Sequence, residues 1–102
     1  MAKKKKEAVP QDKNVVATVV ATMIEMGKFY FLNGKYPQAI AEFKKALEIE
    51  PNSAEIYYNL GLIYETQNKL NEAHQMYEQA LSINPKYSLA KQHLNKLIGI
   101  DK

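Results

Sequence analysis

The chain has 102 residues, of which 46% are apolar and 25% charged, a composition typical of one soluble domain, and no apolar run approaches the ~20 residues of a membrane span. It has no cysteine, which excludes disulfides, thiolate nucleophiles and cysteine-ligated metal centres and permits a cytoplasmic location. The net charge of +3 belongs to residues 1–13, because the nine lysines and nine acidic residues of 14–102 cancel.

Residues 1–12, MAKKKKEAVPQD, combine a lysine run with no apolar face to bury, and this composition predicts a disordered basic tail. Its simplest interpretation is a solubilising tail. Contact with nucleic acid or an anionic membrane is indicated only through Lys3, Lys4, Lys5 and Lys6. No aromatic residue is interleaved with these lysines, which disfavours a site for single-stranded nucleic acid.

A first helix is predicted from about Lys13 to Leu32, with Asp12 or Asn14 as its N-cap. Asn33-Gly34 then tolerates the positive φ of a turn. A second helix follows to about Glu48.

Proline and serine set the boundaries of the remaining helices. Pro51 ends the second helical region, and Ser53 caps a third helix over about 53–67. A fourth helix over about 70–83 stops before Pro85, and a fifth is predicted over about 86–98.

The segments 20–53 and 54–87 repeat one another with a period of 34 residues. Eight of the 34 positions are identical, and in the first copy they are Gly27, Tyr30, Lys35, Ala39, Ala46, Leu47, Ile49 and Pro51. Other positions keep the size of the side chain, as in Met23 with Tyr57, Met26 with Leu60 and Phe43 with Tyr77. A fixed period of this length indicates stacked helical repeats.

The pattern resembles the tetratricopeptide repeat family. The bulky residue, leucine, glycine and tyrosine of that family's first helix stand here as Tyr57, Leu60, Gly61 and Tyr64, and its second-helix residues as Ala73, Tyr77, Ala80 and Pro85. The resemblance covers about 20–98. It implies an all-α domain over 13–102, in which antiparallel helix-turn-helix repeats stack as a short right-handed superhelix, an α-solenoid, closed by a capping helix at about 86–98.

The resemblance also implies how the helices pack. A glycine inside a helix costs about 1 kcal/mol relative to alanine, so close approach of a partner helix has to compensate. The expected arrangement sets Gly27 against Ala39 and Gly61 against Ala73, with the aromatic residues filling wider gaps. In the fifth helix the core contacts are expected from Leu94, Leu97 and Ile98.

The first helix is longer than the repeat requires, because the repeat begins only near Val20. Val15, Val16 and Val19 therefore form an apolar extension. Either this extension folds over the first repeat as a cap or it presents an exposed patch to another molecule. Capping is favoured, because terminal repeats are usually modified to close a solenoid.

The resemblance implies a protein-interaction scaffold without chemistry of its own, whose concave groove is lined by the first helix of each pair. The apolar floor of that groove is predicted to comprise Ile24, Phe31, Tyr58, Leu62 and Leu89. The flanking polar residues are predicted to be Lys28, Asn59, His93 and Lys96. Such a mixture suits a peptide with apolar anchors and some acidic character. The alternative is that Ile24, Leu62 and Leu89 merely pack neighbouring helices together.

Some members of the family grip chaperone tails with a two-carboxylate clamp. Only Asn59 matches that clamp, since Ile24, Lys28, Leu89 and His93 occupy its other positions, so chaperone-tail binding is disfavoured. A homodimer through the extended first helix is an alternative role. No enzyme, small-molecule substrate, cofactor or metal is expected, because His74 and His93 lack a matching cluster of ligands or a nucleophile.

Overall fold

The computed structural model describes residues 12–99 as five helices, with no strand in that range. They are α1 (Lys13–Leu32), α2 (Tyr36–Ile49), α3 (Ala54–Thr66), α4 (Leu70–Ile83) and α5 (Ser88–Leu97). The predicted all-α repeat fold is confirmed. The predicted basic tail lies outside the described residues except for Asp12, so a membrane or nucleic-acid role for Lys3–Lys6 stays a prediction.

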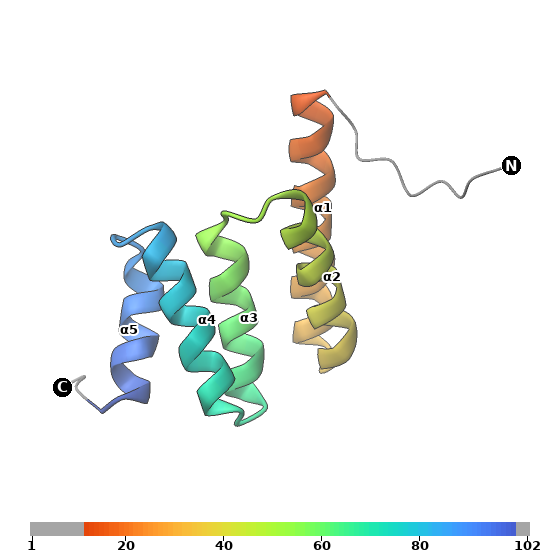
Figure 1. Cartoon of the computed structure of the whole chain (residues 1–102). Coiled ribbons are helices and arrows are strands. Elements are labelled where there is room, and N and C mark those ends of the chain that lie inside the picture. Colours follow the sequence, from red (N-terminus) through yellow and green to blue (C-terminus); the bar gives the residue numbers. More distant parts are fainter. Residues whose placement is uncertain (1–11, 100–102) are drawn as a thin grey trace, which may run out of the picture.

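The helices form two antiparallel pairs and a single last helix. Figure 1 shows α1 with α2 at one end of the row, α3 with α4 in the middle and α5 at the other end. The strongest packing is within each pair, and α2 against α3 joins the two pairs. Because each pair contacts only its neighbours, α1 and α5 each have one side that no helix of residues 12–99 covers.

Local chemistry explains where the helices begin and end. The carboxylate of Asp12 accepts a hydrogen bond from the Asn14 backbone N–H at 2.8 Å, which caps α1. The Ser53 hydroxyl accepts from the Ile56 N–H at 3.3 Å and caps α3. The turn after α1 and the turn after α3 are alike, because Gly34 (φ +74°) and Asn68 (φ +62°) take the left-handed conformation at equivalent positions.

Two aromatic rings fill the helix pairs. Phe43 on α2 and Tyr77 on α4 are almost completely buried. A Cβ added to Gly27 would lie 2.6 Å from the Phe43 ring, and one added to Gly61 would lie 2.5 Å from the Tyr77 ring. The expectation that these rings fill wider gaps away from the glycines is therefore corrected: the atoms nearest to each added Cβ belong to the aromatic ring, which needs the space that a side chain would occupy.

The last helix differs in part from its prediction. Leu94 and Leu97 pack against the second pair as expected, but the fully buried residue of α5 is Ala90, and Ile98 is exposed. Ile98 is the C-cap residue, beyond the last turn of the helix. Its expected core contact was therefore wrong, because the helix ends before Ile98 can turn inward.

The extension of α1 is both a cap and an exposed surface. α3 begins at Ala54, whose equivalent one repeat earlier is Val20, whereas α1 already begins at Lys13. Val16 packs against the core and Val20 is buried, but Val15 is 44% exposed. One side of the extension therefore closes the first repeat, and another side stays open.

α1 is long and apolar enough to cross a membrane by length and composition, and it is the one such helix among residues 12–99. The expectation that no apolar run approaches the length of a membrane span is therefore corrected. Mostly buried core helices and signal sequences near an N-terminus pass the same test, and 17% of this window is buried. Here the inner side of α1 is part of a packed core, because Val20, Ile24 and Gly27 are buried against the neighbouring helices.

Candidate functional site

Two residues of the predicted groove lie mostly inside the protein. Ile24 and Asn59 are each 8% exposed, and Ile24 belongs to the core cluster of the first pair. The Asn59 side-chain amide donates to the Glu55 backbone carbonyl within α3, at 2.8 Å. Only a small part of either side chain is therefore accessible from the groove.

Lys28 links the first helices of the two pairs. Its ammonium lies 3.5 Å from the Glu55 carboxylate on α3 and 3.9 Å from Glu25 on α1. All three side chains are partly exposed, so each pair contributes less than about 1 kcal/mol to stability. The main consequence is local charge, because the cation is matched by two carboxylates.

Tyr58 is the centre of an aromatic cluster between α3, α4 and α5. Its ring centroid lies 5.4 Å from that of Tyr87, 5.7 Å from that of His93 and 6.0 Å from that of Tyr77. The contacts with Tyr87 and His93 are edge-to-face, a favourable arrangement for aromatic rings. Tyr58 therefore helps to attach α5, in addition to any role in a groove.

The Glu65 carboxylate contacts two polar groups of this aromatic cluster. Glu65 Oε1 accepts a 2.6 Å hydrogen bond from the Tyr77 hydroxyl and lies 3.1 Å from His93 Nδ1. Burial, followed by this hydrogen bond, raises the pKa of Tyr77 well above its usual value of 10.0. Burial and the Glu65 charge also raise the pKa of Tyr58, so these hydroxyls stay protonated at neutral pH.

The remaining predicted groove residues differ in their surroundings. Phe31 packs against the first core cluster, with its ring tilted on that of Tyr36 at 5.8 Å. Leu62 packs against the buried residues of α4 and α5, whereas Leu89 and Lys96 on α5 are exposed.

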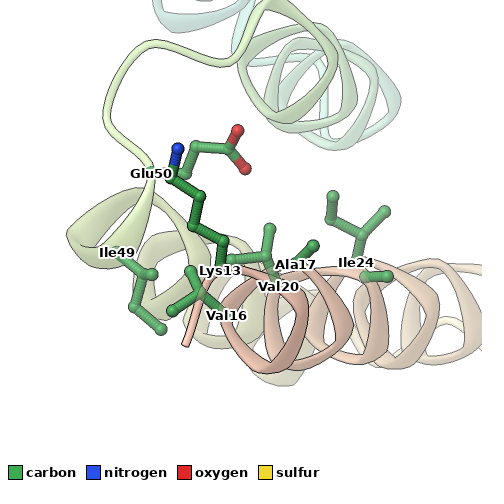
Figure 2. Close-up of a pocket in the computed structure, with 8 residues that line it drawn as sticks. Lys13, Val16, Ala17, Val20, Ile24, Ile49 and Glu50 are labelled. Atoms are coloured by element: carbon green, nitrogen blue, oxygen red, sulfur yellow. The ribbon is translucent and has the colours of Figure 1, made fainter. Parts of the chain in front are cut away.

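A pocket of about 440 Å³ lies beside the extension of α1. Figure 2 shows Ala17, Val20 and Ile24 rising from α1, with Lys13 and Glu50 placed at one end of the pocket. Ala21 on α1 completes the lining together with Val16 and Ile49. Lys28 comes one turn after Ile24 on the same side of α1, so the pocket continues the predicted groove toward the N-terminus.

The sequence interpretation missed most of these residues. Glu65 was recognisable, because it lies on the same row of α3 as Tyr58 and Leu62, at helical spacing. The pocket had a weaker signal in Ala17 and Ala21, two small residues one turn apart. Nothing in the sequence placed Ile49 and Glu50 opposite them, since that depends on how α2 ends against α1.

Within residues 12–99, no three His, Cys, Asp or Glu side chains come together as metal ligands. His74 lies 3.7 Å from Glu78 on the same helix. The side chains described along the predicted groove and the pocket are aromatic rings, aliphatic groups and paired charges.

Comparison with known proteins agrees with this description. Residues 27–68 match a family described as TPR repeat, and residues 54–87 match one described as tetratricopeptide repeat. Tetratricopeptide repeat protein 14 of Mus musculus is 34% identical over 71 residues, which are 70% of this chain and 9% of that protein. The peroxisomal targeting signal receptor of Kluyveromyces lactis is 30% identical over 69 residues, 68% of this chain and 12% of the receptor.

The chain thus spans only about a tenth of the length of these curated relatives. Among solved structures, the first TPR of Spaghetti (RPAP3) bound to the HSP90 peptide SRMEEVD has a TM-score of 0.76 at 23% identity. That match covers 81% of this chain and 66% of the other, and at this identity it shows the fold. The repeat period, the two helix pairs and these matches agree, and the chain belongs to the tetratricopeptide repeat family.

Proposed function

We propose that this domain binds a segment of a partner protein along α1, α3 and α5, with an apolar side chain of the partner in the pocket beside the α1 extension. A general role in protein–protein interaction follows from the family. The groove, the pocket and the kind of ligand are the parts that we propose.

The pocket is the observation that carries the proposal. Its lining is mainly aliphatic, and its two charged residues, Lys13 and Glu50, lie at one end. Concave sites of this size, with an apolar floor and a few polar groups, are typical places for a ligand side chain. The pocket depends on the extension, because Lys13, Val16 and Ala17 all precede the start of the repeat at Val20.

The charges along the predicted groove favour an apolar anchor over an acidic tail. Lys28 already pairs with Glu25 and Glu55, and His93 lies against Glu65. An incoming carboxylate would have to compete with these groups, whereas an aliphatic side chain gains free energy from leaving water. We therefore propose a leucine, isoleucine or methionine anchor, and not the peptide that is bound in the Spaghetti structure.

Filling the pocket tests the proposal. Ala21 is exposed and lines the pocket without belonging to the core, so Ala21→Trp occupies the space and leaves the fold intact. The probe is a set of peptides selected from a random displayed library against the unmodified full chain. We expect Ala21→Trp to weaken their binding at least about tenfold, which corresponds to ~1.4 kcal/mol.

Ala41→Trp is the matched control, because Ala41 is equally an exposed helical alanine but lies on α2 and does not line the pocket. It should leave the dissociation constant unchanged. Backbone amide shifts on titration should map to α1, α3 and α5. Selected peptides that bind Ala21→Trp as tightly as the unmodified chain, or shifts confined to α2 and α4, would falsify the proposal.

A further inference from the structure

The side of α1 away from the pocket carries a second apolar surface. Val15, Val19, Thr22, Met26 and Phe29 follow one another at spacings of four and three residues, which keeps all five on one side of the helix. We call this set the end face. Val15, Met26 and Phe29 are 44%, 37% and 57% exposed, and no member of the end face is charged.

The second repeat shows what such a face accommodates. Thr22, Met26 and Phe29 are equivalent to Ile56, Leu60 and Ile63, which lie 34 residues later. Those three residues are 0%, 2% and 0% exposed, because they pack into the core of the first pair. The end face of α1 therefore corresponds to the face of α3 that packs against the first pair. On α1, no helix of residues 12–99 covers this face.

We propose that the end face is covered by the end face of a second copy of the chain, with the two α1 helices antiparallel. A spacing of 3.5 residues is the period with which two helices pack against each other. Antiparallel pairing about Thr22 sets Val15 against Phe29 of the second copy and Val19 within one residue of Met26, so a small residue lies beside a large one on either side of the Thr22 pair.

Thr22 at the centre of the end face is compatible with burial. Its hydroxyl donates to the Thr18 backbone carbonyl at 2.9 Å, inside its own helix. The polar group is therefore already satisfied, and the methyl group is left for the contact. Two copies of Thr22 meeting on the two-fold axis would leave no donor unpaired.

The area of the end face fits a weak dimer. Three of its five side chains are 37–57% exposed, which leaves an area on the order of 350 Å² per copy. Pairing two copies would bury about 700 Å², the size of a weak or transient contact. We therefore expect a dissociation constant on the order of 100 μM to 1 mM, with monomers at low concentration.

Sedimentation equilibrium of the full chain, from a few micromolar to the millimolar range, measures this constant. The mass should rise from 11.7 kDa toward twice that value. Phe29→Glu places a charge in the end face and should weaken dimerisation more than about tenfold, because a charge at an apolar contact is desolvated without a partner. Leu70→Glu, at a 45% exposed position on α4, is the matched control and should leave the mass unchanged.

Mixing variants tests the direction of the helices. Phe29→Glu mixed with Val15→Lys should form a heterodimer, because the antiparallel arrangement brings those two positions together, whereas Phe29→Glu mixed with Phe29→Lys should not. Restoration by the second mixture overturns the antiparallel pairing. A chain that stays monomeric at millimolar concentration, or a dimer that persists in a Phe29→Glu variant of unchanged helicity, overturns the proposal, as does a monomer whose end face binds lipid vesicles instead.

Discussion

The two helix pairs share one sequence frame, but equivalent residues in them have different surroundings. Phe43 and Tyr77 occupy the same place in each pair, and each lies against a glycine of the preceding helix. Met26 and Leu60 are also equivalent, yet Met26 is 37% exposed and Leu60 is 2% exposed. Packing inside a pair is therefore repeated, whereas packing between pairs depends on which neighbour is present.

This difference separates two kinds of information in the repeat. Residues that face the other helix of their own pair are determined by the 34-residue pattern alone. Residues that face the preceding pair are buried only if a preceding pair exists. Within residues 12–99, the first pair therefore has an exposed apolar end face where the second pair has core residues.

Truncating the equivalent residues Met26 and Leu60 should give the largest difference between the pairs in the free energy of unfolding. Leu60→Ala removes a buried side chain and should lower the free energy of unfolding by about 2–5 kcal/mol. Met26→Ala removes a partly exposed side chain and should cost less than about 1 kcal/mol. Urea unfolding at a few micromolar protein measures both values in the monomer. Equal losses in the two variants would contradict the difference, because they would mean that Met26 is as well covered as Leu60.

Much of the fold followed from local sequence signals. The bounds of α1 and α4 agree with their predictions, and Asp12, Ser53 and Gly34 act as expected. These features depend on capping chemistry and helical periodicity within a few residues. The error at Ile98 has the same local origin, since the last turn of a helix is the part that periodicity predicts least well.

The candidate site was less predictable, because it depends on contacts between elements. Asn59 was predicted to flank the groove, but its amide bonds to its own helix and the residue is mostly buried. His93 was predicted beside it, and its position is explained by Glu65, 28 residues away in the chain. A helical face read from sequence shows which residues share a side, but it does not show how much of each the next helix covers.

The two helix glycines test whether packing inside the two pairs is alike. Gly27→Ala and Gly61→Ala would each gain up to about 1 kcal/mol in helix propensity. The added methyl group, however, meets a buried aromatic ring at 2.6 Å or 2.5 Å, and such overpacking costs about 1–3 kcal/mol. We expect a net loss of about 1–2 kcal/mol in each variant, measured by urea unfolding.

A compensating change isolates the cause of this loss. Tyr77→Leu removes the ring that faces Gly61, so in that background Gly61→Ala should no longer destabilise the domain. If Gly61→Ala costs the same with and without the ring, the close contact does not explain the glycine.

The Tyr77 hydroxyl gives a smaller difference between the pairs, because the equivalent Phe43 has no hydroxyl. Tyr77→Phe removes the hydrogen bond to Glu65 and should cost about 1 kcal/mol at neutral pH. The folded state raises the pKa of Tyr77 above its ordinary 10.0, so the stabilisation is complete below pH 10.0 and is lost as the pH rises above it, when the unfolded chain ionises first. The free energy of unfolding should fall by up to about 1.4 kcal/mol per pH unit for each such tyrosine, and less steeply in Tyr77→Phe. Urea unfolding at several alkaline pH values, together with tyrosinate absorbance of the folded protein, measures both slopes; identical slopes in the two proteins would show that Tyr77 does not titrate differently on folding.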